Sequence, residues 1–578
     1  MASFLVAVAI SGRASGSFLI GLWTGTLVVA VAGLVWSVQR RPSGPRDSAE
    51  PAPKAPRPGS LRWMLLSGLV ALLPVAYLTL AGDFFDDFNA IGHRSLIAQF
   101  QNDVFPPRHQ VFPEYPFRYH YGFNLLAAAL TALFRLSVPW AIDLLVIVCF
   151  LWSWCLAWVL GERLTRSGSG GWTALASLGG GGAFFWLIAH AHWASQGAVG
   201  IVIGGNRINF PVVMYFFQKP FTLGFPLALA VMLAASFPAP GLGWLRRSSL
   251  LAVLLASLYL VQEELFVTVG LSLAAQELLR ERHLRALVPV AASLPLAVLM
   301  GGVLFTPMPE RHGELLRVRF WPAQGDPWGV LAWYALTSGL LLPLGIAGLF
   351  ATRRLRTLLL LLMLGSFGAP LFFENPYSWD IVKLATIGEL AAGLAAGSVL
   401  AALAEKPTWP RASLLAVLVI LLVASPVGYL GYWIREMVRP TPEIGQPLAM
   451  QRDLPRVDDW EKVLRWLRGQ RSLEGTIYAM NPRLSQMILL AGLNGAGPPR
   501  WIDLEFGVPQ DRIDRRSVLL KELPRDPRAW RREGVSWFVV GPGEPVAPTV
   551  QAWVASRAAR AVKAAGPWTI YHLEAPSR

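Results

Sequence analysis

Two neighbouring aspartates are the first residues of this chain whose placement could support catalysis. Asp86 and Asp87 follow closely on the hydrophobic stretch 65–80. Carboxylates at the mouth of a membrane span are costly to desolvate, so such residues are functional candidates. One of them could take the proton from an attacking hydroxyl, or bind a metal ion that orients it. The alternative is that both cap a following helix, because Asp is stabilising near a helix N-terminus.

A pair of glutamates is the second candidate. Glu263 and Glu264 lie between the apolar segments 249–262 and 265–279, which predict a hairpin of two helices with the pair at its tip. If these carboxylates are buried, they need Arg or Lys partners. A proton-coupled transporter could also use such a pair, and an exposed hairpin tip is the simplest alternative.

Cations that could bind an anion form the third group. Lys383 stands at the start of a hydrophobic stretch, in the same short loop as Glu374 and Asp380. It could contact a lipid phosphate as a point charge, or extend to the membrane surface as lysines commonly do. Further cations expected on the same side of the membrane are Arg207, Lys219, Arg317 and Arg319.

The histidines do not predict a zinc site. His190 and His192 are two residues apart and would point to opposite sides of a helix. His93, His109 and His120 lack the usual ligand spacing.

The elements that must position these residues are membrane-spanning helices. Of the 578 residues, 54% are hydrophobic and only 15% are charged, whereas a soluble chain carries about 25% charged residues. Apolar runs near 20 residues recur along the chain, and they predict roughly twelve spans by length. The expected fold class is therefore a polytopic α-helical membrane protein.

The net charge of +15 does not indicate a nucleic-acid partner, because of where the charge lies. Arg and Lys gather in loops that alternate with loops of balanced charge, which is the positive-inside pattern. That pattern places the basic loops in the cytoplasm and the Asp86 loop outside.

Three regions are expected along the chain. Residues 1–60 predict an anchor helix followed by a disordered cytoplasmic linker. Residues 61–436 predict the transmembrane domain, with an outer loop at 83–138 that contains two short interfacial helices. Residues 437–578 alternate helical and strand patterns, which predicts an extracytoplasmic α/β domain. Within it we expect helices at 457–470, 525–534 and 548–566, and strands at 476–480, 535–541 and 568–574.

Four segments resemble the GT-C superfamily of membrane glycosyltransferases, which take sugars from polyprenyl-phosphate carriers. DFFDDFNAIGHRSLIAQF is similar to the acidic motif and first interfacial helix of that family, and RYHYGFNLLAAALTALFRLSVPWAIDLL to its second interfacial helix and next span. NPYSWDIVKLATIGELAAGLAAG resembles the late loop that carries a basic residue near the donor phosphate, and GVSWFVVG a strand near the end of the outer domain.

The resemblance implies an inverting transferase of a hexosyl or pentosyl group in a bacterial-type inner membrane. The donor would be a polyprenyl-phosphate sugar, and the acceptor a lipid, glycan or protein on the extracytoplasmic face. By position, Asp86 or Asp87 would be the base, and Lys383 would contact the donor phosphate. The other expected contributors are the cations Arg207, Arg317 and Arg319 and the acids Glu263, Glu264 and Asp380.

The segment 193–220 departs from the family, because it has no acidic residue where several members carry one. A divalent metal ion is therefore the one cofactor that the resemblance leaves open. Two other functions also stay open: a proton-coupled transporter or lipid flippase that uses Glu263 and Glu264, and a non-catalytic membrane scaffold with an outer binding domain.

Overall fold

The structure is a computed structural model of the chain, and it describes most of the helical segments. The described residues are 1–39, 58–82, 92–164, 169–182, 211–237, 243–281, 284–305, 317–318, 334, 338–352, 355–374, 383–405, 408–439, 460–470, 475–497 and 508–574.

Six described helices are long and apolar enough to cross a membrane. They are α3 (Pro58–Ala81), α6 (Val138–Leu164), α11 (Lys219–Ser236), α12 (Trp244–Val261), α18 (Lys383–Glu405) and α19 (Trp409–Val438). The bundle is completed by α7 (Gly170–Gly179), α10 (Pro211–Phe217), α13 (Glu263–Glu281), η2 (Leu284–Leu287), α14 (Val288–Met300), α16 (Leu341–Leu349) and α17 (Arg356–Phe372). The chain is thus a multi-pass, mostly helical membrane protein, and the expected count of roughly twelve spans stays a prediction.

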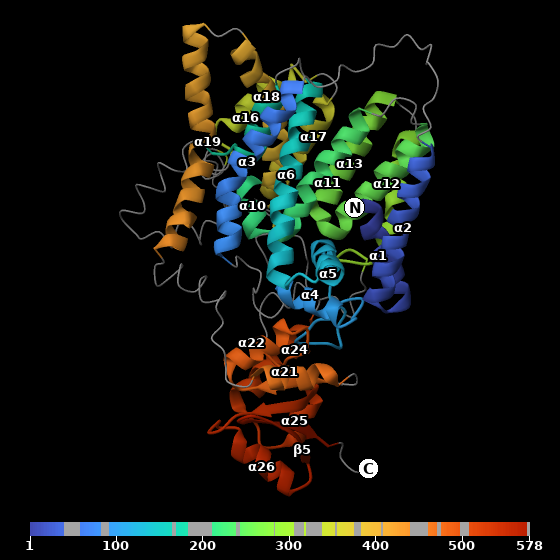
Figure 1. Ribbon diagram of the computed structural model, residues 1–578, viewed down its shortest axis with the longest axis vertical. Helices are drawn as coiled ribbons and strands as arrows, with labels where there is room; N and C mark the ends of the chain where they lie inside the picture. The colour runs from blue at the N-terminus through green and yellow to red at the C-terminus, as the bar shows by residue number, and fades with distance from the viewer. Residues whose placement is uncertain are drawn as a thin grey trace.

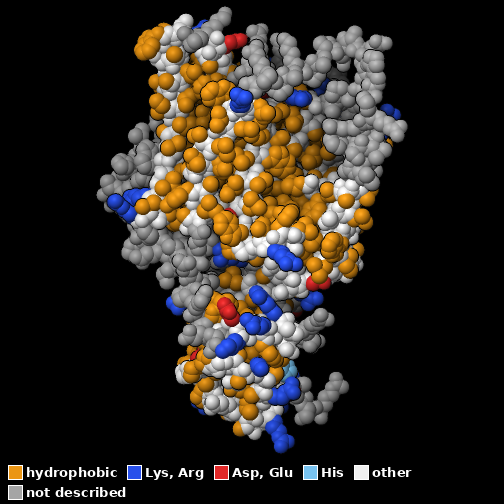
Figure 2. All heavy atoms as spheres, in the orientation of Figure 1, with side chains coloured by type: hydrophobic (Ala, Val, Ile, Leu, Met, Phe, Trp, Pro, Cys, Tyr) orange, Lys and Arg blue, Asp and Glu red, His pale blue; other side chains and the backbone are white. Residues whose placement is uncertain are grey.

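The surface of the bundle is what a lipid environment requires. Figure 2 shows hydrophobic side chains over most of the described bundle surface in view, whereas Lys and Arg gather farther down, over the C-terminal part. On α3, for example, large apolar side chains are about half exposed or more, namely Leu65, Leu66, Leu69, Val70 and Leu73. Apolar surface of this extent is stable only against lipid or another apolar partner.

Helix α18 lies at the centre of one half of the bundle. It contacts α7, α16 and α17, and glycines let these backbones approach closely. A Cβ on Gly348 of α16 would overlap the carbonyl oxygen of Ala395 in α18.

An N-terminal helical hairpin packs on the other half. It consists of α1 (Ala2–Ser15), which was not predicted, and α2 (Phe18–Gln39), which matches the first hydrophobic run. Leu5 and Val8 of α1 are fully buried, and α1 contacts α12 and α14. Asp103 accepts hydrogen bonds from the hydroxyl of Ser17 at 2.8 Å and the backbone N–H of Leu19 at 2.9 Å, so this carboxylate caps the start of α2.

Two short helices cover one end of the bundle, which we call the covered end (Figure 1). They are α4 (His93–Gln101) and α5 (Gly122–Phe134), and they contact each other and α6. The sequence predicted two short interfacial helices here; the first was expected to begin at Asp87, which lies outside the described residues.

The last part of the chain forms a C-terminal α/β unit (residues 460–574) beyond α4 and α5 (Figure 1). Its sheet has the order β3-β4-β6-β5, with β3 and β4 parallel and the other pairs antiparallel. The strands are β3 (Thr476–Ala479), β4 (Val535–Val540), β5 (Ala559–Ala565) and β6 (Trp568–Leu573). The helices are α21 (Trp460–Gly469), α22 (Pro482–Leu490), α24 (Gln510–Glu522), α25 (Pro527–Arg532) and α26 (Ala547–Ala555). The only other described strands, β1 (Arg317–Val318) and β2 (Phe373–Glu374), pair antiparallel near the bundle.

One element of this unit was predicted wrongly. The segment 548–566 was expected to be one helix, but α26 ends at Ala555 and β5 follows as an edge strand. Arg557 adopts a left-handed backbone conformation with φ 60°, which breaks the helix. The alanine-rich sequence favours a helix, and pairing with β6 overrides that preference.

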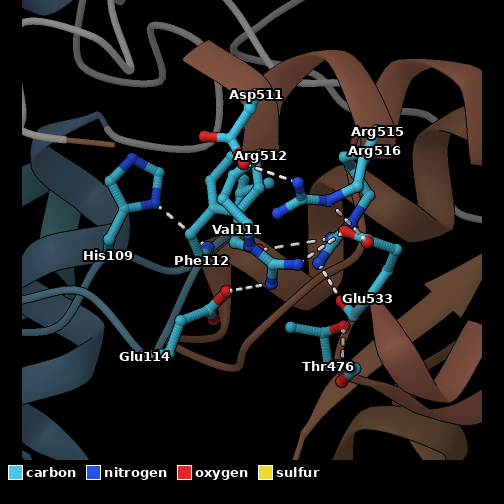
Figure 3. Close-up of polar contacts among 11 residues, drawn as sticks. His109, Val111, Phe112, Glu114, Thr476, Asp511, Arg512, Arg515, Arg516 and Glu533 are labelled. Atoms are coloured by element: carbon cyan, nitrogen blue, oxygen red, sulfur yellow. Dashed lines mark hydrogen bonds and ion pairs between the residues drawn. The ribbon is translucent and has the colours of Figure 1, made fainter. Parts of the chain in front are cut away.

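The C-terminal unit is fastened to the segment between α4 and α5 by arginines of α24 (Figure 3). Arg516 is fully buried, donates to the carbonyl oxygen of Val111 at 3.3 Å, and lies 5.0 Å over the ring of Phe112. Arg512 pairs with Glu533 at 2.8 Å and with Glu114 at 2.5 Å. Glu114 is 39% exposed, so its pair with Arg512 contributes little. The buried contact of Arg516 with Val111 and Phe112 is the one that holds the two parts together.

Replacing Gly348 by alanine should destabilise the bundle, because the added methyl group has no room between α16 and α18. We expect a loss of about 1–3 kcal/mol, seen as a lower midpoint of thermal unfolding in detergent. Gly365 of α17 is the matched control, since nothing lies within 4 Å of an added Cβ there. Gly365→Ala should leave stability equal or higher, and equal midpoints for the two variants would contradict the close packing.

Candidate functional site

The junction between α12 and α13 presents two carboxylates at the covered end. Gln262 adopts an extended backbone conformation after α12, and α13 starts again at Glu263. This break places Glu263 and Glu264 in the first turn of α13, where the helix dipole stabilises negative charge.

A histidine from the covering segment meets this junction. The Nδ1 atom of His120 lies 2.9 Å from a carboxylate oxygen of Glu263, and the two side chains are only 9% and 15% exposed. His120 Nδ1 and the carboxylate oxygens of Glu263 and Glu264 lie within 4.8 Å of one another. Glu263 is therefore not at an exposed tip. Within the described part of the chain its ion-pair partner is His120 rather than the expected Arg or Lys.

Gln262 is a buried neighbour of this cluster. Its side chain is 1% exposed, and its amide nitrogen donates to the carboxylate of Glu264. Its carbonyl oxygen is buried and has no hydrogen-bond partner among the described residues. A buried acceptor in this state costs about 1–3 kcal/mol.

A second polar contact joins α4 to α5. His93 Nδ1 lies 2.9 Å from the side-chain oxygen of Asn124, and both residues are buried. Burial lowers the pKa of His93 to about 3, and the positive charges of Lys219, His120 and Lys383 lower it further, against the raising effect of the Asn124 hydrogen bond. His93 is therefore a neutral ring at neutral pH.

Two lysines lie close enough to His93 at the covered end to affect its pKa. Lys219 is the first residue of α11 and is 1% exposed; Lys383 is the first residue of α18 and is 6% exposed. The start of a helix is its positive end, so it is an unfavourable place for a cation, and burial of an ammonium adds to that cost. These two lysines place positive charge near one neutral histidine at the covered end.

Arg118 lies near Glu263. Its Nε and Nη2 atoms donate to the carbonyl oxygen of Val303 at 3.2 and 2.6 Å. Burial lowers the pKa of Arg118, while the charge of nearby Glu263 opposes that shift. The glutamates thus have a cation close to them, although not in direct contact by a described ion pair.

The structure places some of the predicted residues and leaves others undescribed. Asp86, Asp87, Arg207, Arg319 and Asp380 lie outside the described residues. The backbone of Arg317 in β1 is in register with Glu374 of β2. Lys383, Glu263 and Glu264 are at the covered end.

Sequence reasoning missed the roles of His93, Asn124 and His120. His120 is 143 residues from Glu263, so a search for local ligand spacing could not join them. Lys219 was named only as one of several outward cations, and its burial had no local signal.

The fold is similar to that of one large membrane glycosyltransferase. The arabinofuranosyltransferase AftD from Mycobacteria matches with a TM-score of 0.50 and 14% identity, over 89% of this chain and 40% of AftD. The chain therefore spans less than half the length of that protein. The oligosaccharyltransferase of Archaeoglobus fulgidus matches more weakly, with a TM-score of 0.38 and 12% identity, over 83% of this chain and 69% of that one.

No protein-family model matches the sequence, and no curated protein matches it. The likeness in fold agrees with the resemblance seen in the sequence. At 14% identity the likeness shows the fold but does not establish the activity.

His93 should make the protein less stable in mild acid. The unfolded chain takes up a proton on this histidine below about pH 6.5, whereas the folded chain does so only near pH 3. Stability is then fully present above about pH 6.5 and falls as the pH is lowered, by up to about 1.4 kcal/mol per pH unit. His93→Gln removes this titration and keeps a polar partner for Asn124, so its unfolding midpoint should depend less steeply on pH. Equal slopes for the wild type and the variant would show that His93 is not held neutral.

Proposed function

We propose that this chain is an inverting membrane glycosyltransferase that moves a sugar from a polyprenyl-phosphate donor to an acceptor hydroxyl at the covered end. The single observation that carries the proposal is the convergence of Lys219 and Lys383, both buried at helix starts, near His93. The GT-C fold supports the reaction class.

The lysines supply what the leaving group needs. When the bond between the anomeric carbon and the donor oxygen breaks, the phosphate keeps the electron pair and gains negative charge. Fixed cations in a site with little water stabilise that charge strongly. Lys383 contacts the phosphate in this proposal, with Lys219 beside it, and Arg207, Arg317 and Arg319 are further candidates for the same role.

The base is Asp86 or Asp87. The acceptor oxygen attacks the anomeric carbon as the carboxylate takes the hydroxyl proton, so one displacement inverts the configuration. Asp87 precedes His93 by six residues, and a chain of that length reaches at most about 21 Å. The proposal therefore requires the carboxylate to act within that reach of His93. Glu263, Glu264 and Asp380 are supporting acids.

The partners follow from this arrangement. The polyprenyl tail of the donor would lie against the apolar bundle, whose exposed side chains suit a lipid chain. The acceptor, whether a lipid, a glycan or a protein, would approach from the side of the C-terminal α/β unit, which is extracytoplasmic in this proposal.

One observation favours a transporter as the second candidate. Glu389 lies within α18 and is fully buried, and in the part of the chain that the structure describes neither of its carboxylate oxygens has a hydrogen-bond partner. Ionisable residues inside a membrane are functional candidates. Movement of a lipid-linked sugar across the membrane without transfer would favour this candidate over the enzyme.

The variants Asp86→Asn and Asp87→Asn should show which of the two aspartates is the base. The variant that loses the base should lose transfer by about 100-fold or more, while its expression and unfolding midpoint stay normal. The measurement is release of polyprenyl phosphate from a panel of short-chain polyprenyl-phosphate pentoses and hexoses, with the full-length protein in nanodiscs. The panel is narrowed by mass spectrometry of lipids that co-purify with the wild type.

The matched control for the aspartates is Asp514→Asn. Asp514 is an exposed carboxylate of α24 that accepts from Gln510, so its loss should not affect transfer. Full activity in both single variants and in the double variant would remove this mechanism.

Lys383→Gln should weaken use of the donor. Loss of a charged hydrogen-bond donor to phosphate costs about 1.5–3 kcal/mol, which is about 10- to 160-fold in kcat/KM. Lys521→Gln in the C-terminal unit is the control. An unchanged kcat/KM for Lys383→Gln would mean that this lysine does not contact the donor.

A further inference from the structure

The cluster at the start of α13 has the dimensions of a metal site. Ligand atoms bound to one ion lie about 2.0–2.6 Å from it, so any two of them are at most about 5 Å apart. His120 Nδ1 and the carboxylate oxygens of Glu263 and Glu264 meet this limit, since all lie within 4.8 Å of one another. A single ion placed among them can reach all three.

Gln262 gives a second and independent indication. Its carbonyl oxygen is buried without a partner, while its amide nitrogen already holds Glu264. Amide carbonyls are common ligands of hard cations, and a cation in the cluster would satisfy this acceptor. The hydrogen bond from the amide to Glu264 orients the carboxylate as contacts around metal ligands usually do.

The ligands are brought together by tight packing rather than by a flexible loop. Gly122 begins α5, two residues after His120, and a Cβ there would lie 2.7 Å from Cγ2 of Val261 and 3.0 Å from the carbonyl oxygen of Leu260. Only a glycine allows this approach. His120 is therefore held against the α12–α13 junction before any ion binds, which lowers the cost of forming the site.

We propose that His120, Glu263, Glu264 and the carbonyl oxygen of Gln262 bind one divalent metal ion. The set of two carboxylates, one amide oxygen and one imidazole suits Mn²⁺, because carboxylate and carbonyl oxygens select hard ions and one imidazole is compatible with them. The two cysteines of the chain, Cys149 and Cys155, belong to α6 and are not part of the set.

The ion site and the transferase activity are separate claims. Binding of the ion can be measured without a donor or an acceptor. Only its role rests on the proposed function: a bound ion would add positive charge at the end of the bundle where the donor phosphate is proposed to lie.

The test uses full-length protein in detergent, stripped with a chelator and titrated with Mn²⁺ alone. Electron paramagnetic resonance should count one bound ion per chain, and pulsed measurements should show nitrogen coupling from one imidazole. His120→Ala should remove that coupling, and Glu263→Gln and Glu264→Gln should each weaken binding by at least about tenfold. The unfolding midpoint of each variant without metal reports whether it is folded.

His572→Ala is the matched control. His572 also lies near a glutamate, with Nδ1 at 3.9 Å from Glu574, but this pair is not part of a described three-residue cluster. Its replacement should change neither the affinity nor the nitrogen coupling.

Three outcomes would overturn the site. They are absence of Mn²⁺ binding in the wild type, nitrogen coupling that persists in folded His120→Ala, and unchanged affinity in the two glutamine variants. Mn²⁺ binding by a protein that transfers no sugar would leave the site standing and count against the proposed function. Transfer by a protein that binds no Mn²⁺ would overturn the ion site and leave the proposed function standing.

Discussion

The contact between His120 and Glu263 is the interaction on which the covered end depends. It joins the segment between α4 and α5 to the junction of α12 and α13 across a layer with little exposure to water. In such a layer an unpaired charge costs several kcal/mol, so every ionised group must be matched. At this end of the fold Glu263 opposes the lowering of the pKa of Arg118, and the two lysines help to lower the pKa of His93, mainly lowered by burial.

Much of the fold could be predicted from local patterns. Hydrophobic runs located α3, α6 and the pair α12 and α13, because a membrane span needs a long apolar helix. Alternating apolar residues located β3, β4 and β6 in the tail. Local reasoning failed at β5, whose alanines favour a helix and whose strand conformation comes from pairing with β6. It also missed α1, a short helix stabilised by packing on α12 and α14.

The candidate site could be predicted only in part, because most of its contacts join distant segments. Glu263, Glu264 and Lys383 were recognisable as charges at the ends of apolar runs. Their neighbours were not, since His120 reaches Glu263 over 143 positions of sequence. Asp86 and Asp87 were identified by their place after a span and by a resemblance, and their role stays a prediction.

The fastening of the C-terminal unit has a consequence for how the protein is made. Arg516 and Val111 are 405 positions apart, and contacts of such long range form late because closing a large loop is slow. Domains generally fold as the ribosome releases them, from the N-terminus onward. The segment that carries His120 therefore leaves the ribosome long before α24 exists. It stays without its final support until roughly 400 further residues have been made. Premature termination before α24 would then impair the bundle end as well as the C-terminal unit.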